Sequence, residues 1–247
     1  MNAVSTVPDE ASIFALWVYL AQSPLLWLTI TVGVFLIAQQ LARLSGYRPI
    51  VNPVLISIVA TASILALTHT DYRIYFAGAQ FVHFLLGPAT VALGVPLYRN
   101  RRLVISALLP IVTSLITGAV VAILSAVWLS TLLGAPHALT LALAPKSVTA
   151  GIAMGIAQQI GADPTLTAVF VISTGIFGAI IVTPLMNALG IKDFAARGFA
   201  AGLASHGIGT ARAFQVDDVA GAFAGLAMAL NGLATALLAP VVLRWFM

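Results

Sequence analysis

An apolar run broken by a proline and a lysine, at residues 141–155, most constrains how this chain can fold. It reads LALAPKSVTAGIAMG, with Pro145, Lys146 and Ser147 at the break and Gly151 shortly after it. Proline removes a backbone donor and clashes with the preceding turn, and bilayer hydrocarbon offers no water to the freed carbonyls. A lysine at that depth is costly and usually marks a site. The stretch therefore predicts a discontinuous helix whose break faces protein or a water-filled cavity.

The composition indicates a polytopic membrane protein. The chain has 247 residues, of which 61% are hydrophobic and 7% charged, and its mean hydropathy is +1.07. A soluble domain of this size could not bury so much apolar surface. The basic residues mostly stand at the ends of apolar runs, as the positive-inside rule predicts, and form no patch for nucleic acid. We therefore expect an all-α fold in the bilayer and no nucleic-acid partner.

The apolar runs predict about seven to eight membrane elements within a single membrane domain, residues 1–247. Asp9 and Glu10 precede the first apolar run without a basic residue, which argues against a cleaved signal peptide. We expect an N-terminal interfacial segment over residues 1–23, because its apolar part is too short to span. Spans are predicted at residues 24–44, 53–68, 164–189 and 219–243, with one long span or two short pieces over 103–133.

The broken run has an apparent copy earlier in the chain. Laying GPATVALGVPL (87–97) over APKSVTAGIAM (144–154) pairs a proline, a hydroxyl residue and a glycine at one offset. These residue types build unwound segments, and the pairs are Pro88 with Pro145, Thr90 with Ser147, and Gly94 with Gly151; Gly87 precedes the first proline. Such paired, interrupted segments indicate a transporter binding site. The alternative is two unrelated proline kinks.

The repeat predicts broken-helix elements at residues 74–98 and 138–160, with a third glycine-interrupted element at 200–214. The sequence leaves open whether these elements cross the membrane or re-enter. Two re-entrant hairpins would be inverted relative to each other, and two crossing helices would be parallel.

The break at Lys146 has the chemistry that a small anion needs. A half-helix starting at Ser147 would present unpaired N–H groups and a positive dipole end. Lys146 adds a full charge, and Ser147 and Thr149 add hydroxyls, so a carboxylate is the expected guest. The alternative is a lysine that snorkels from the end of a segment.

The third element, AAGLASHGIGTARAF, contains a histidine that can change charge near neutral pH. Gly207 and Gly209 loosen the backbone beside His206, and Arg212 follows closely. This combination suits a second anion contact or a proton-coupling site. The alternative is a hydrogen-bonded interfacial histidine and a cytoplasmic arginine.

Three further polar residues are candidate contacts for the substrate: Thr90, Thr210 and Asn231. Asn231 could equally join helices by hydrogen bonding. No catalytic motif is recognisable, and acidic residues lie at loops, so the sequence predicts no enzyme, metal or cofactor.

Several motifs resemble the LrgB/CidB-type membrane proteins, from about Arg43 onward. They are PATVALGVPLY, PKSVT with IAM, ASHGIGTARA and GAFAGLAMALNG. The resemblance implies an integral protein of the bacterial cytoplasmic (inner) membrane. The family's PKSVT is often followed by Thr-Pro where this chain has Ala150 and Gly151, which leaves out one hydroxyl.

The resemblance implies two functions. One is work with a separate small LrgA-like, holin-like protein in murein hydrolase export and control of lysis. The other follows from similarity to the LrgB-like part of the plastid glycolate/glycerate translocator and to bacterial relatives linked to pyruvate uptake. The anion-site chemistry favours the second, a secondary transporter of small monocarboxylates that works by alternating access and could be homo-oligomeric.

Overall fold

The computed structural model describes residues 23–92 and 94–244, and all regular structure in that part is helical. The chain separates into two compact units, residues 1–89 and 90–247, and each is described by itself. The expected interfacial segment, residues 1–23, lies outside the described residues except for its last residue. The expectation of a single membrane domain stays a prediction.

The first unit contains α2 (Pro24–Leu44), α3 (Pro53–Leu67) and α4 (Tyr72–Phe84). Proline begins α2 and α3, where its missing N–H costs nothing. The Asn52 side chain caps α3 by accepting two backbone N–H groups. Gly78 lets α4 approach α2 closely, because a Cβ there would lie 2.8 Å from the Trp27 Cβ.

The expected broken element at residues 74–98 is a series of short helices. After α4 come α5 (Leu86–Ala92) and α6 (Gly94–Arg99). Gly87 and Pro88 lie inside the first turn of α5, and the helix is interrupted before them, at Leu85. A proline in a first turn removes an N–H that would have no intrahelical partner, so it does not break the helix there. The side chain of Thr90 lies outside the described part of the structure.

The second unit contains two long helices, α8 and α11, each followed by an interrupted helical pair, and ends in α13. Its elements after α6 are α7 (Arg101–Ser106), α8 (Leu108–Leu132), α9 (His137–Leu143), α10 (Ala150–Gln159), α11 (Pro164–Ala188), α12 (Phe194–Val216) and α13 (Asp218–Leu243). Asp163, Asp193 and Asp217 each accept a backbone N–H at the start of the next helix, which fixes where α11, α12 and α13 begin.

Four helices in the described residues are long and apolar enough to cross a membrane: α2, α8, α11 and α13. Three of them match predicted spans closely. The predicted span over residues 103–133 is two pieces, α7 and α8. The fold is therefore an all-helical membrane fold, and the count of seven to eight membrane elements stays a prediction.

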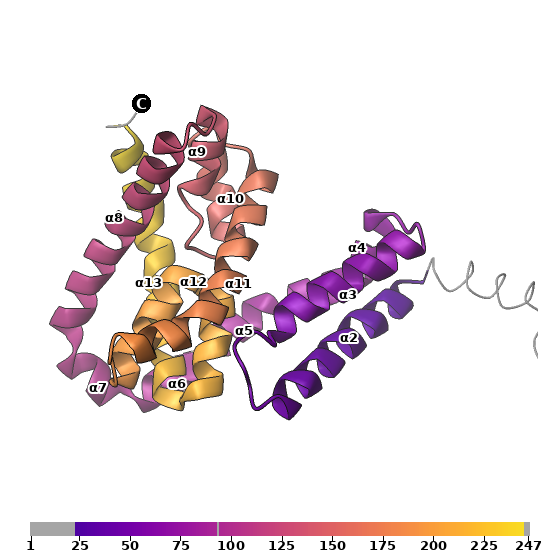
Figure 1. Ribbon diagram of the computed structural model, residues 1–247, viewed down its shortest axis with the longest axis horizontal. Coiled ribbons are helices and arrows are strands. Elements are labelled where there is room, and N and C mark those ends of the chain that lie inside the picture. Colours follow the sequence, from indigo (N-terminus) through magenta and orange to yellow (C-terminus); the bar gives the residue numbers. More distant parts are fainter. Residues whose placement is uncertain (1–22, 93, 245–247) are drawn as a thin grey trace, which may run out of the picture. The chain divides into compact units, whose positions relative to one another are not determined.

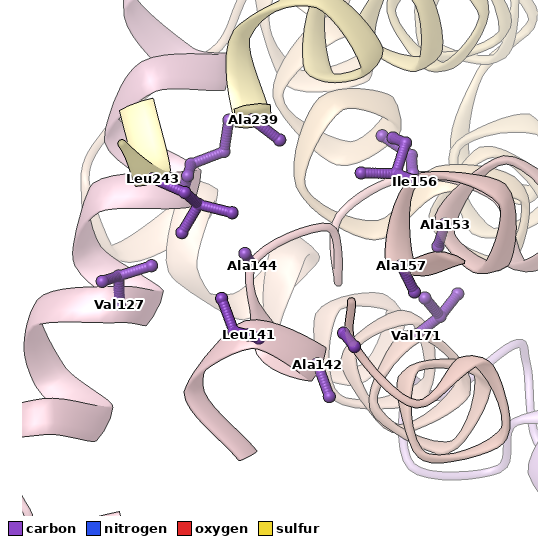
Figure 2. Packing of buried hydrophobic residues seen from close by; sticks show 13 residues of the cluster. Val127, Leu141, Ala142, Ala144, Ala153, Ile156, Ala157, Val171, Ala239 and Leu243 are labelled. Carbon is purple, nitrogen blue, oxygen red and sulfur yellow. The ribbon is translucent and has the colours of Figure 1, made fainter. Parts of the chain in front are cut away.

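The core of the second unit lies where α9 and α10 pack between the longer helices (Figure 2). Leu141 and Ala144 belong to the same buried cluster as Val127 of α8 and Leu243 of α13, and this cluster also includes residues of α10 and α11. A second region joins α12 to α13 through small residues. Gly198 and Gly202 admit the backbone of α13 so closely that a Cβ on either would overlap it, a packing typical of membrane helices.

Candidate functional site

The first interruption, residues 144–149, separates α9 from α10. Its turns are short, with Lys146 N donating to Leu143 O at 3.1 Å and Val148 N donating to Pro145 O at 3.3 Å. Thr149 precedes α10 in an extended conformation and its side chain caps nothing. The first turn of α10 therefore presents N–H groups and the positive end of its dipole.

The second interruption, Ser205 and His206, divides α12. Ser205 has φ −130° and ψ 16°, and His206 has φ 42° and ψ −133°. Positive φ is uncommon for a residue with a Cβ and is a frequent feature of functional sites. The sequence placed the loosened backbone at Gly207 and Gly209, whereas the non-helical residues are the two immediately before them.

Contacts with α11 fix the second interruption. His206 Nε2 lies 2.9 Å from the carbonyl oxygen of Val171, and the Thr210 hydroxyl donates to His206 O at 2.8 Å. Two glycines of α11 make room: a Cβ on Gly175 would lie 2.6 Å from His206 Cε1, and one on Gly178 would overlap Ser205 Oγ. The interruption is therefore a defined conformation that packs into a notch left by Gly175 and Gly178 of α11.

Asn231 of α13 joins the two interruptions. Its side chain is 1% exposed, and Nδ2 donates to Ser147 O at 3.3 Å and to Leu203 O at 3.0 Å. Its Oδ1 accepts a hydrogen bond from the Thr235 hydroxyl at 3.2 Å. One amide thus donates to a carbonyl at each interruption, 84 and 28 residues away in sequence.

The two interruptions also share a cavity of about 900 Å³. Lys146 and Ser147 border it from the first, and Ala204 and Ser205 border it from the second. Its walls come from α8, the middle of α11 and the first half of α12, and they are mainly apolar. The polar residues on it are Ser114, Lys146, Ser147, Ser173, Thr174, Asp193 and Ser205. An apolar cavity with a few convergent polar groups is the usual form of a small-molecule site.

Lys146 is the cation of this cavity. Its side chain is half-buried, and Nζ donates to Ser147 Oγ at 3.3 Å. The acidic residues of the described part stand at helix starts, and of these Asp193 borders the cavity where α12 begins. A lysine among apolar walls is favourable when an anion binds beside it.

The other predicted site residues lie away from the cavity wall. Thr149 precedes α10, and His206, Thr210 and Asn231 are buried in the packing behind the cavity. Arg212 does not border the cavity that Lys146 borders. It borders a separate space of about 20 Å³ and donates from Nε to Thr183 Oγ1 at 3.3 Å and from Nη1 to Gln215 Oε1 at 3.2 Å.

Sequence reasoning missed the hydroxyl residues that border the cavity from the neighbouring helices. Ser173 and Thr174 stand in the middle of the apolar helix α11, and Ser114 stands in α8. The adjacent hydroxyl residues within the apolar α11 were the signal in the sequence that could have indicated a polar site there. Ser205 directly precedes His206 in the motif already singled out.

Comparison with known proteins assigns the family. The model of the LrgB-like family matches residues 31–245. The holin-like protein CidB of Staphylococcus epidermidis is 32% identical over 199 residues, covering 81% of this chain and 87% of that protein. The uncharacterized protein YxaC of Bacillus subtilis is 30% identical over 214 residues, covering 85% and 93%.

CidB of Staphylococcus aureus is 28% identical over 222 residues, covering 90% of this chain and 96% of that protein. No solved structure matches the chain. The match to the family extends over most of the chain and includes α8, α11, α13 and the greater part of α2, the four helices long enough to span a membrane. The chain therefore belongs to the LrgB-like family and is an integral protein of the bacterial cytoplasmic membrane.

Proposed function

We propose that this chain is the larger membrane component of a two-protein holin-like system, working with a separate small LrgA-like membrane protein. The observation that carries the proposal is its similarity to proteins named holin-like protein CidB over most of both chains. In this role it takes part in murein hydrolase export and control of lysis and catalyses no reaction.

Size limits how a hydrolase could leave the cell by this route. A folded domain of about 100 residues has a radius of gyration of about 13 Å, far too large for a cavity of about 900 Å³. The second unit of one chain therefore cannot conduct a folded enzyme through this cavity. The holin-like role requires either an assembly of several chains with the partner or control of another pore.

Deletion in the host tests the holin-like role. We expect loss of the chain to change extracellular murein hydrolase activity, measured by zymography, and the rate of autolysis, with both restored by the chain expressed from a plasmid. Purification of the tagged chain from membranes should also recover the LrgA-like protein. Unchanged hydrolase release and lysis in the deletion strain would contradict this role.

A second function is favoured by the cavity: secondary transport of a small monocarboxylate such as pyruvate, glycolate or glycerate. Lys146 supplies a charge and Ser147 a hydroxyl at one end of the cavity. A charge and a hydroxyl side by side suit a carboxylate. The two interruptions support the predicted use of repeated discontinuous helices for alternating access.

Purified protein in liposomes separates the two functions. A carrier gives saturable uptake of a labelled carboxylate and retains unrelated dyes. A pore-forming component, with or without the LrgA-like protein, releases dyes of either charge. Dye retention with no uptake of any small carboxylate would exclude transport by the isolated chain.

A further inference from the structure

We propose that residues 108–159 and 164–216 form an inverted repeat, in which each half is a membrane-spanning helix followed by a re-entrant helical hairpin. The two hairpin tips then enter one site from opposite faces of the membrane. This repeat differs from the one that the sequence suggested between residues 87–97 and 144–154. If the chain is a transporter, the repeat supplies its two routes of access, and this consequence rests on the proposed transport function. The topology itself can be tested without assuming transport.

The two halves have the same order and nearly the same lengths. Both α8 and α11 have 25 residues, and a short connection follows each. The interrupted pair α9–α10, residues 137–159, is then as long as the 23 residues of α12. Placing Ser147 on Ser205 also pairs Gly151 with Gly209.

The first hairpin, α9 and α10, packs at one end of the second unit (Figure 1). Its buried cluster contains Val127 from the last part of α8, Val171 from the first half of α11, and Ala239 and Leu243 from the last part of α13. Its two outer ends adjoin the end of α8 and the start of α11, which lie at the same end of the unit. The chain therefore enters and leaves α9–α10 on one side.

The second hairpin, α12, packs at the opposite end. Arg197 near its start and Arg212 near its finish both donate to Thr183, to the carbonyl at 3.5 Å and to the hydroxyl at 3.3 Å. Its two halves therefore lie side by side. Ala201 and Ala213, one from each half, share a buried cluster with Ala220 and Ala224 from the first part of α13.

The two tips meet near the middle of α13, where Asn231 donates to Ser147 O and Leu203 O. A bound anion would contact Lys146 from the first hairpin and Ser205 from the second. Displacement of either hairpin alone would open the site toward the face from which that hairpin enters. Alternating access then requires two movements related by the repeat.

Single cysteines test the topology directly, because the natural chain has no cysteine. The four positions are exposed and lie at the outer ends of the hairpins: His137→Cys, Gln159→Cys, Lys192→Cys and Asp218→Cys. Each variant is treated in intact cells with a membrane-impermeant maleimide, and then again after permeabilisation to measure total reactivity. Ala138→Cys and Gln158→Cys, also exposed, replace any position at the first hairpin that does not react after permeabilisation.

We expect the cysteines at residues 137 and 159 to react together on one face and those at 192 and 218 to react together on the other. One pair should be labelled before permeabilisation and the other only afterwards. If the two cysteines of one pair react from opposite faces, the segment between them crosses the membrane, and this result would overturn the proposal. All four on one face would also overturn it. Because no substrate is used, the result is independent of whether the chain transports carboxylates.

Discussion

Replacing Asn231 with leucine should destabilise the second unit by separating the two interruptions. Leucine has the same number and branching of side-chain heavy atoms, so the main effect expected is the loss of the amide donor from the carbonyls of Ser147 and Leu203. A buried polar group left without its partner costs about 1 to 3 kcal/mol, which gives about 2 to 6 kcal/mol for the two. Membrane proteins show smaller averages, about 0.6 kcal/mol for each interhelical hydrogen bond, which sets a lower bound of about 1.2 kcal/mol.

The assay is reversible unfolding in mixed micelles, followed by tryptophan fluorescence, for matched amounts of wild type and variant. Thr235→Val is the control, because it removes only the bond to Asn231 Oδ1 and keeps the amide donor. We expect the control to lose less stability than Asn231→Leu. A free energy of unfolding for Asn231→Leu within about 0.5 kcal/mol of wild type, the range of an ordinary surface change, would refute the reasoning.

Two further predictions concern the second interruption. Gly178→Ala should lower the unfolding midpoint, because the added Cβ would overlap Ser205 Oγ and overpacking costs about 1 to 3 kcal/mol. Gly151→Ala, where the space is open, is the control and should be neutral or stabilising. An equal loss of stability in both variants would contradict a specific notch for Ser205 in α11. His206→Gln can keep a donor to the Val171 carbonyl and should flatten any pH dependence of carboxylate uptake that arises from protonation of this histidine. A mutant profile identical to that of wild type would limit His206 to positioning the interruption.

The helices were largely predictable from local signals. A proline at the start of an apolar run predicted where α2, α3 and α11 begin, and an aspartate or asparagine cap marked the starts of α3, α11 and α13, each to within a residue or two. These signals depend only on neighbours in the chain. The break at Pro145 was predictable in the same way, because lysine and serine follow the proline at membrane depth.

A proline predicts that a helix is interrupted nearby, but not on which side of the proline the interruption lies. Pro88 lies in the first turn of α5, three residues after the interruption at Leu85, whereas Pro145 lies within the interruption that follows α9. In the sequence alone, the two prolines have similar neighbours and predict the same kind of interruption.

The assembled site depends on contacts between distant segments, which one sequence does not contain. Arg212 was a candidate for a second anion contact because it follows His206 closely, yet the fold of α12 places it beside Thr183, and it does not border the cavity. The role of Asn231 likewise needs the positions of two carbonyls from other segments.

The proposed transport function requires that the two interruptions build one anion site with Lys146 as its cation. The most direct measurement is the carboxylate affinity of Lys146→Met, compared with wild type and Lys146→Arg, for matched amounts of folded protein in liposomes. Methionine removes the charge at similar length, and loss of a charged partner should weaken binding by at least about 1.4 to 3 kcal/mol, roughly ten- to more than a hundredfold. Folding should survive, since removing a charge from hydrocarbon removes a cost. An affinity for Lys146→Met within about twofold of wild type, a difference of well under 1.4 kcal/mol, would place the anion site elsewhere.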